Sequence, residues 1–440
     1  MTTATTSPSA ATATDRFAAL YEGARAALAG SARDGEMARR DAAMARFREM
    51  GVPRRGDEEW KYTNLAGLDA LPFELAGAAR VVAPEAVEPA LVGAGPRIVL
   101  VNGRFDERLS DATEAPAGVT VEAHVPADAS VLDRCTDLAP LPFARLCEAL
   151  APTAAVVRVA PGVEAAEPIQ AVFITTAGDA PVAAFPRLRV EAGAGASVTV
   201  VETHLVMGAG ATVAASLTEI DAADGARVVH ECTADLNESS WRLAAIVIRQ
   251  ARSSRVESAA VATGGGVTRH DFRASLDGPG ADCALRGLAM LSRDEHVDNH
   301  LLVRHAAPEC TSREFFKNVL DGSSRGVFCG RIHVDQDAQK TDGVQTNATI
   351  LLSDDAEAQS RPQLEIYADD VKCTHGATVG QLDEGAVFYL RSRGLPEARA
   401  RALLIDGFAG EILDAYTVAA VRDRLKSALF GPIPGGAGAA

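Results

Sequence analysis

The sequence predicts a mainly β protein in which a long repetitive β core is flanked by helical segments. Between Arg97 and Val334 the chain is a series of short runs in which apolar and polar residues alternate, as in SVTVVETHLV and RVVHECTADL. Such alternation is typical of strands. Turns rich in Gly and Asp recur roughly every 14 to 20 residues, which indicates a repeat architecture. Aromatic residues make up only 5% of the chain, and small or β-branched residues suit a narrow core.

Two architectures fit this pattern, a β-sandwich and a parallel β-helix with stacked coils. No amphipathic helices of about 10 to 15 residues stand between the runs, which disfavours a doubly wound sheet. The repetition, the small residues and the length of 440 residues favour the β-helix, in which each coil is buried against its neighbours. We therefore assign residues 96–382 to the β core.

Helical patterns precede the core in residues 15–95. Residues Phe17, Tyr21 and Leu28 have helical spacing, and a second helix is expected from about Gly35 to Met50. We expect these helices to cap one end of the solenoid, because exposed strand edges invite aggregation.

The segment around Trp60 follows these helices. Trp60 either anchors a partner or packs beneath the helices, and we favour the packed position. Residues 1–14 are rich in Ser, Thr and Ala and lack the features of a secretory signal. They are expected to form a disordered tail, as are residues 431–440.

Residues 383–430 are predicted to be helical. Asp383 can cap a short helix that ends at Gly394, and Pro396 opens a second helix.

The second of these helices carries an apolar stripe with two glycines beside it. The stripe and the glycines together are Leu404, Gly407, Phe408, Gly410 and Ile412. The glycines leave room for another chain to approach closely. This face therefore either docks a partner or packs only on its own solenoid.

Charge and cysteine usage narrow the range of functions. The 43 basic and 59 acidic residues give a net charge of −16, which disfavours nucleic acid as a partner. No apolar run is long enough to form a membrane-spanning helix. The seven cysteines are dispersed, with no CxxC pair, which indicates reduced thiols and a cytoplasmic location.

The segment with the clearest chemical signal is YADDVKCTHGATVG, which contains Cys373 and His375. Side chains on a strand repeat every two residues, so the thiol and the imidazole share a face. Both are ligands that iron, copper and zinc accept. An iron–sulfur cluster usually has four protein ligands, and these two residues supply at most two. Any cluster or iron bound here is therefore either completed by ligands from another chain or held only transiently.

Other candidate sites are weaker. Cys329 and His333 also alternate on a run, and we favour a solvated face over a second metal contact. His296 and His300 have the spacing of a helical zinc site, but their segment is predicted to be a strand and turn, so that we discount them.

The residues Asp369 and Asp370 raise the alternative of a carbohydrate-cleaving β-helix. Neighbouring residues on a strand point to opposite faces, so these carboxylates form a poor acid–base pair. The chain has no GxxxxGK[ST] loop, so any ATP hydrolysis must come from another subunit.

The C-terminal part of the chain resembles the SufB/SufD family, the scaffold subunits of the Suf iron–sulfur cluster assembly machinery. The resemblance rests on YADDVKCTHGATVG, on Gln339-Lys340-Thr341-Asp342 and on Phe388-Tyr389-Leu390-Arg391. The form of the first motif is similar to SufD rather than SufB.

This resemblance implies a right-handed parallel β-helix and a non-catalytic scaffold. It implies pairing with a SufB-like subunit, with His375 and then Cys373 contributing to a transient iron–sulfur cluster at the shared interface. It also implies that the C-terminal helices dock a SufC-like ABC-type ATPase. The sequence gives no indication of whether a flavin binds. The alternatives are a homodimeric β-helix scaffold without a metal role and, less favoured, the carbohydrate-active enzyme.

Overall fold

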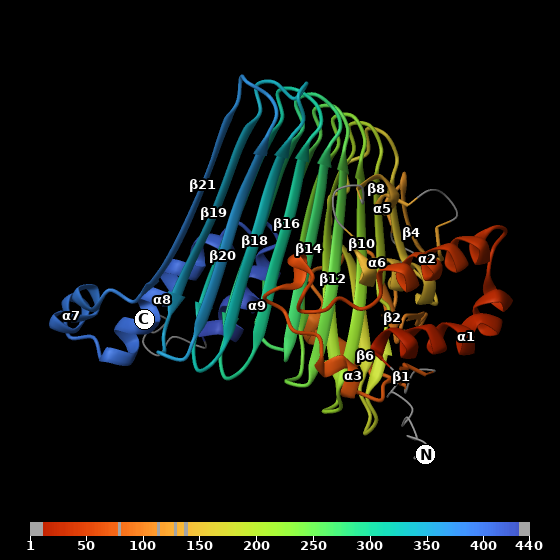
Figure 1. The fold of residues 1–440 in the computed structure, drawn as a ribbon, viewed down its shortest axis with the longest axis horizontal. Coiled ribbons are helices and arrows are strands. Elements are labelled where there is room, and N and C mark those ends of the chain that lie inside the picture. Colours follow the sequence, from red (N-terminus) through yellow and green to blue (C-terminus); the bar gives the residue numbers. More distant parts are fainter. Residues whose placement is uncertain (1–11, 78–80, 112–114, 127–129, 136–139, 431–440) are drawn as a thin grey trace, which may run out of the picture.

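The computed structural model describes residues 12–77, 81–111, 115–126, 130–135 and 140–430. Its central feature is a solenoid of two sheets that face each other, and the chain passes from one sheet to the other at each turn (Figure 1). Arg227 pairs with Arg255, and Asp282 pairs with Thr311, so one coil takes 28 or 29 residues there. The predicted parallel β-helix is confirmed.

The first sheet, sheet A, contains the even-numbered strands from β8 onward together with several earlier strands. Its members are β1 (Glu74–Leu75), β4 (Val119–Ala123), β5 (Ala155–Val159), β7 (Val182–Ala184), β8 (Arg187–Ala192), β10 (Thr212–Ala222), β12 (Ser240–Gln250), β14 (Val267–Leu276), β16 (His296–His305), β18 (Arg325–Val334) and β20 (Glu357–Ile366). From β5 to β20 every pair in this sheet is parallel, whereas β4 pairs with β5 in the antiparallel sense.

The second sheet, sheet B, contains the odd-numbered strands from β9 onward together with β2, β3 and β6. Its members are β2 (Arg97–Val101), β3 (Arg104–Phe105), β6 (Ile169–Thr176), β9 (Ser197–Met207), β11 (Arg227–Asp235), β13 (Arg255–Ala262), β15 (Asp282–Leu291), β17 (Thr311–Leu320), β19 (Asp342–Leu351) and β21 (Lys372–Gln381). Strand β3 is antiparallel to β2, and the remaining pairs are parallel.

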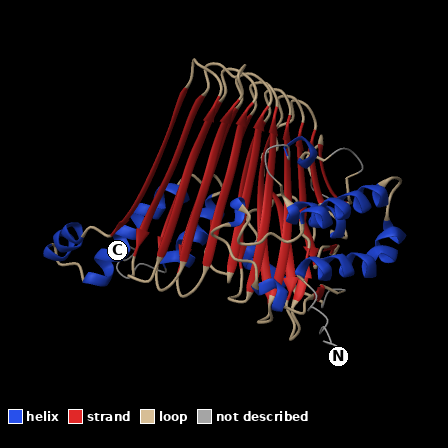
Figure 2. Cartoon of the chain, viewed as in Figure 1, coloured by secondary structure: helices blue, strands red, loops and turns tan. Residues whose placement is uncertain are grey.

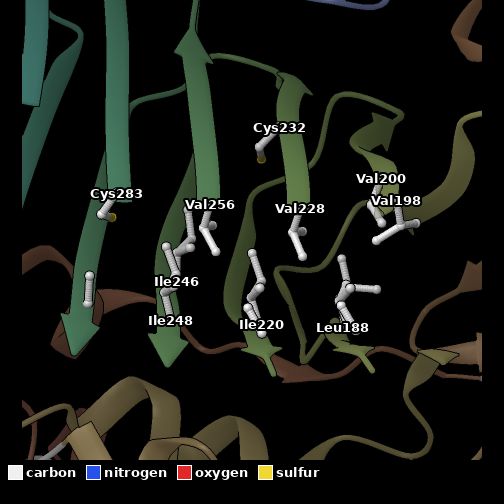
Figure 3. Packing of buried hydrophobic residues seen from close by; sticks show 14 of the residues in the cluster. Leu188, Val198, Val200, Ile220, Val228, Cys232, Ile246, Ile248, Val256 and Cys283 are labelled. Carbon is white, nitrogen blue, oxygen red and sulfur yellow. The ribbon is translucent and has the colours of Figure 1, made fainter. Parts of the chain in front are cut away.

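The main core lies between the two sheets. Figure 3 shows Leu188, Ile220 and Ile248 of sheet A opposite Val198 and Val228 of sheet B, and all of these side chains are at most 2% exposed. Small and β-branched side chains fill this narrow space, because strands on both sides bury every second residue.

The longer N-terminal helices cover the outer face of sheet A (Figure 2), whereas the short turn at Val87 packs against β2 and β6 of sheet B. The helical elements before the regular coils are α1 (Ala13–Ser31), α2 (Glu36–Met50), η1 (Glu58–Trp60), α3 (Gly67–Ala70), α4 (Pro84–Val87), η2 (Glu88–Ala90), α5 (Leu132–Cys135) and α6 (Pro142–Leu150). Phe17, Phe47 and Leu146 share one cluster with Leu217 of β10 and Val247 of β12.

The expectation that these helices cap the end of the solenoid is therefore wrong. The physical reason is that outward-facing Leu217 and Val247 give the side of the coils an apolar surface, which the helices bury. The predicted boundaries of the second helix are close to those found, since α2 begins at Glu36 and ends at Met50.

The C-terminal helices are α7 (Glu384–Ser392), α8 (Glu397–Leu413) and α9 (Ala419–Phe430). Helices α8 and α9 lie on the opposite side, against the outer face of sheet B, whereas α7 contacts α8 and projects beyond the last strands (Figure 1). Asp383 caps α7 by accepting a hydrogen bond from the Gly385 backbone N–H, and Gly394 follows the helix with a φ of +92°, as predicted. None of the described helices has the length and apolar character needed to cross a bilayer.

Candidate functional site

The solenoid ends at strands β20 and β21, each of which pairs with one neighbour only. Figure 1 shows β21 at the edge of the stack, beyond β19. Five of the eight large apolar side chains that are exposed in the described part of the chain lie at this end, namely Ile366, Tyr367, Val379, Phe388 and Tyr389. This concentration makes the end of the solenoid the main candidate for a protein interface.

Cys373 and His375 both lie on β21, the outermost strand of sheet B. Their partners on β19 are Gly343 and Gln345, and both partners are buried. Because strand positions two apart share a face, Cys373 and His375 both lie on the interior face of the last coil. No later coil packs beside β21, so inward positions that would be buried in the middle of the solenoid are partly or fully exposed here.

The two side chains differ in exposure. Cys373 is half-buried against a small cluster that includes Ile332, Leu364 and Val371. Burial raises the pKa of its thiol. His375 is exposed, and no hydrogen bond to its ring is found among the described residues. The arrangement offers one thiol and one free imidazole, which is fewer than the four ligands that a cluster usually requires.

A buried polar ladder continues inward from the position of His375. Gln345 on β19 pairs with both His375 on β21 and Glu314 on β17, and its Nε2 donates a hydrogen bond to Glu314 Oε2. Burial raises the pKa of Glu314 to about 8, against the opposing effect of that hydrogen bond. The carboxyl group is therefore mostly protonated at neutral pH.

This ladder has free hydrogen-bonding capacity. Glu314 Oε1 and Gln345 Oε1 are buried without a hydrogen-bond partner in the described part of the chain. Gly330 on the opposite sheet leaves room for the amide, because a Cβ there would lie 2.2 Å from Gln345 Nε2. Glu314 and Gln345 were not predicted from the sequence. Both are polar residues at inward positions of their strands.

Cys329 and His333 are not brought into this site. Both lie on outward positions of β18, in register with Arg361 and Glu365 of β20. His333 Nδ1 is 3.1 Å from a Glu365 carboxylate oxygen, and its Nε2 is 3.1 Å from Asp335 Oδ1. The ring thus interacts with two carboxylates on the outer face of sheet A.

His296 and His300 lie on strand β16 and not on a helix, so they do not form the helical zinc site that the sequence analysis discounted. His296 Nε2 is 2.9 Å from Thr63 Oγ1, and His300 Nε2 is 2.6 Å from Glu59 Oε2. Both rings therefore hold the Trp60 segment on the outer face of sheet A. Trp60 itself is 4% exposed, which confirms the predicted packed position.

The five residues predicted for partner docking do not share one environment. Ile412 and Gly410 are buried, because α8 packs against Leu288 of β15 and other outward residues of sheet B. Leu404 and Phe408 are half-buried, and Gly407 is exposed with nothing within 4 Å of a Cβ built on it. The C-terminal part of the apolar stripe thus packs against the solenoid, whereas the face of α8 that carries Gly407 is exposed.

Comparison with known proteins gives two family matches. Residues 173–408 match the SufBD core domain, described as belonging to the SUF system of FeS cluster assembly, and residues 11–170 match the SufBD protein N-terminal region.

Individual relatives agree with these matches. The chain is 33% identical over 390 residues to the iron–sulfur cluster assembly protein SufD of Escherichia coli, covering 88% of this chain and 90% of that protein. It is 32% identical over 398 residues to an iron–sulfur cluster assembly SufBD family protein of Synechocystis, covering 85% and 86%. A SufBD family protein of Mycobacterium tuberculosis is 35% identical over 214 residues, covering 47% of this chain and 54% of that protein.

Proposed function

Because the chain belongs to the SufB/SufD family of iron–sulfur cluster assembly proteins and is most like SufD, we propose that it is a scaffold subunit that pairs with a SufB-like protein. In this proposal the free edges of β20 and β21 form the pairing surface, and the nascent iron–sulfur cluster is the cargo held there. Cys373 and His375 supply part of the ligand set, and the partner supplies the rest. A SufC-like ATPase, which binds the C-terminal helices, provides the energy of ATP hydrolysis.

The observation that supports this proposal is the position of His375. It is an exposed, unpaired imidazole on an edge strand, at the end of the solenoid that carries five of the eight exposed large apolar side chains of the described chain. An edge strand can add a strand from another chain through its free backbone groups. Pairing there would bring ligands from a second polypeptide next to His375 and Cys373.

The cluster role is tested by co-expressing the chain with a SufB-like and a SufC-like subunit and measuring iron and acid-labile sulfide after anaerobic reconstitution. His375→Ala and Cys373→Ser are expected to lower cluster content without changing the co-purified complex. Thr374→Ala is the matched control, because Thr374 is exposed between them on the same strand. Equal cluster content in His375→Ala and wild type would refute the site.

The pairing surface is tested separately with Val379→Lys, which places a charge on the 50% exposed apolar position of β21. Loss of the SufB-like subunit from the purified complex is expected. Val81→Lys is the control, because Val81 is 81% exposed elsewhere on the molecule. A complex that survives Val379→Lys would contradict pairing through β21. A homodimer without iron or sulfide would favour the alternative scaffold.

The ATPase surface is tested with Gly407→Arg, because position 407 is exposed on α8 and has space for a large side chain. We expect this variant to lose the SufC-like subunit while it keeps the SufB-like one. Gly23→Arg on α1 is the matched control, since Gly23 is equally exposed and also has nothing within 4 Å of a Cβ. If both variants retain the ATPase, the docking surface lies elsewhere.

A further inference from the structure

Four metal-ligand side chains interrupt the apolar interior of the solenoid at strands β9 and β11. Glu202 and His204 lie on β9, and His230 and Cys232 lie on β11, and each is at most 4% exposed. Glu202 pairs directly with Cys232 in the strand register. Figure 3 shows Cys232 on the same interior side of β11 as Val228. All four side chains therefore point into one interior layer.

The Glu202 carboxylate lies at the centre of this group. Its Oε1 is 2.5 Å from His204 Nε2, and its Oε2 is 2.9 Å from His230 Nε2. Ligand atoms of Glu202, His204 and Cys232 all lie within 4.8 Å of one another. A zinc ion sits about 2.0 Å from oxygen or nitrogen and about 2.3 Å from sulfur, so one ion can be shared by atoms at this spacing.

We propose that Glu202, His204 and Cys232 bind a divalent transition-metal ion such as Zn²⁺ or Fe²⁺ inside the solenoid, with His230 held beside them by the Glu202 carboxylate. A thiolate and an imidazole suit zinc and iron and are poor ligands for Mg²⁺ or Ca²⁺. The proposed ion is separate from the cluster cargo, because it shares no residue with Cys373 and His375.

Neighbouring side chains orient the proposed ligands. Ser258 Oγ is 2.9 Å from His230 Nδ1, which leaves Nε2 directed at the carboxylate. Thr218 Oγ1 donates a hydrogen bond of 2.7 Å to Glu202 Oε2. Such outer contacts are typical of metal sites, since they hold a ligand in one orientation.

Arg242 on β12 is a positive charge that lies close to Glu202 and Cys232 and could stabilise them in place of the proposed metal ion. Its Nη2 donates to Cys232 Sγ over 3.3 Å and lies 3.9 Å from Glu202 Oε1, while its Nη1 is 2.6 Å from His270 Nε2. In the metal-bound state the Cys232 thiol loses its proton to solvent, and the sulfur bonds to the ion. The guanidinium group then remains as a hydrogen-bond donor to the thiolate, a contact that stabilises the anion.

The proposal is tested by metal analysis of the full-length protein. Because the site is enclosed, the ion must enter before the coils close, so the protein is expressed in medium supplemented with Zn²⁺ or Fe²⁺ and purified without chelators. We expect about one ion per chain in wild type, and loss of that ion in Cys232→Ser and Glu202→Gln. Cys283→Ser is the matched control, since Cys283 is an equally buried interior thiol on β15.

A second measurement identifies the sulfur ligand directly. Protein expressed with Co²⁺ is expected to show a thiolate-to-cobalt charge-transfer absorption that Cys283→Ser keeps and Cys232→Ser loses. The double variant Cys373→Ser/His375→Ala is expected to keep this absorption, which distinguishes the interior ion from the cluster site. Wild type without metal and without the cobalt band would overturn the proposal.

The variants are checked for folding by circular dichroism before metal analysis. Cys232→Ala is the second variant, because a small apolar residue suits the buried position if serine does not. A folded Cys232 variant with undiminished metal content would overturn the assignment of this sulfur. If neither variant folds, the cobalt spectrum of wild type decides, and absence of the thiolate band contradicts the site.

Discussion

Lys317 on β17 holds helix α8 at Phe408. Its Nζ donates a hydrogen bond of 2.8 Å to the Phe408 carbonyl oxygen and lies 4.3 Å from the centroid of the Phe408 ring. The same ammonium group is 2.9 Å from Glu411 Oε2, and Lys317 is only 4% exposed. One buried cation thus connects the solenoid to the helix that is proposed to dock the ATPase.

Lys317→Met is expected to loosen this helix, because methionine keeps the apolar stem and loses the charge. A hydrogen bond to a charged group contributes about 1.5 to 3 kcal/mol, so the local opening free energy of α8 should fall by about 2 kcal/mol. Hydrogen–deuterium exchange would show faster exchange of the α8 amides. The exposed Lys372 provides the control variant Lys372→Met, which should leave the exchange unchanged.

Trp60→Ala is expected to release the N-terminal segment from sheet A. The Trp60 ring lies 5.6 Å from the Phe143 ring, and the Arg269 guanidinium carbon is 3.7 Å from the Trp60 ring centroid. Truncating a buried tryptophan to alanine costs about 3 to 5 kcal/mol. Limited proteolysis should cut the variant faster between α2 and β2, whereas Trp60→Phe should lose less protection. Equal cleavage of Trp60→Ala and wild type would contradict the role of this contact.

Glu314 predicts a pH-dependent stability. Its folded-state pKa of about 8 lies above the ordinary value of 4.5, so between these values the folded chain binds a proton that the unfolded chain has lost. The free energy of unfolding should therefore fall as pH rises through this window, by about 1.4 kcal/mol per pH unit from this group.

The pH dependence is measured by urea unfolding at several pH values between 5 and 8. Glu314→Gln should remove the contribution, because its amide keeps a similar shape without an ionisable proton. The exposed Glu85 gives the control Glu85→Gln, which should behave like wild type. Parallel curves for wild type and Glu314→Gln would show that Glu314 is charged in the folded protein.

Gly287→Ala is expected to strain the interior between β15 and β17. Gly287 pairs with Phe316 in the register, and a Cβ at Gly287 would lie 2.2 Å from Phe316 Cδ1. Overpacking of this kind costs roughly 1 to 3 kcal/mol, which would be measured as a lower free energy of unfolding. Gly376→Ala on β21, where nothing lies within 4 Å, should be neutral. Adding Phe316→Leu should recover part of the loss.

The strands were predictable because the signal for a strand is local. The run RVVHECTADL indicates a strand from its alternation alone, and β11 spans Arg227–Asp235. The cap of α7 was equally local, since Asp383 and Gly394 act on backbone groups within a few residues of themselves.

The position of the helical layers was not predictable in this way. The apolar stripes of α1 and α8 indicate that each helix buries one face, but not which surface it buries. Helix α1 packs on sheet A, in the cluster that contains Leu217 and Val247. Helix α8 packs on sheet B, in the cluster that contains Leu288. These outward apolar positions belong to strands far along the chain, and only folding brings them together with the helices.

By itself, the sequence determined that the chain coils into alternating strands and that Cys373 and His375 share one face of a strand. The tertiary structure alone decided that this strand is the last of its sheet, which leaves His375 exposed, and that Glu202 pairs with Cys232 from the next coil. The physical reason is that side-chain alternation repeats every two residues along one strand, whereas neighbours between coils are set by a register of about 30 residues that local propensity does not encode.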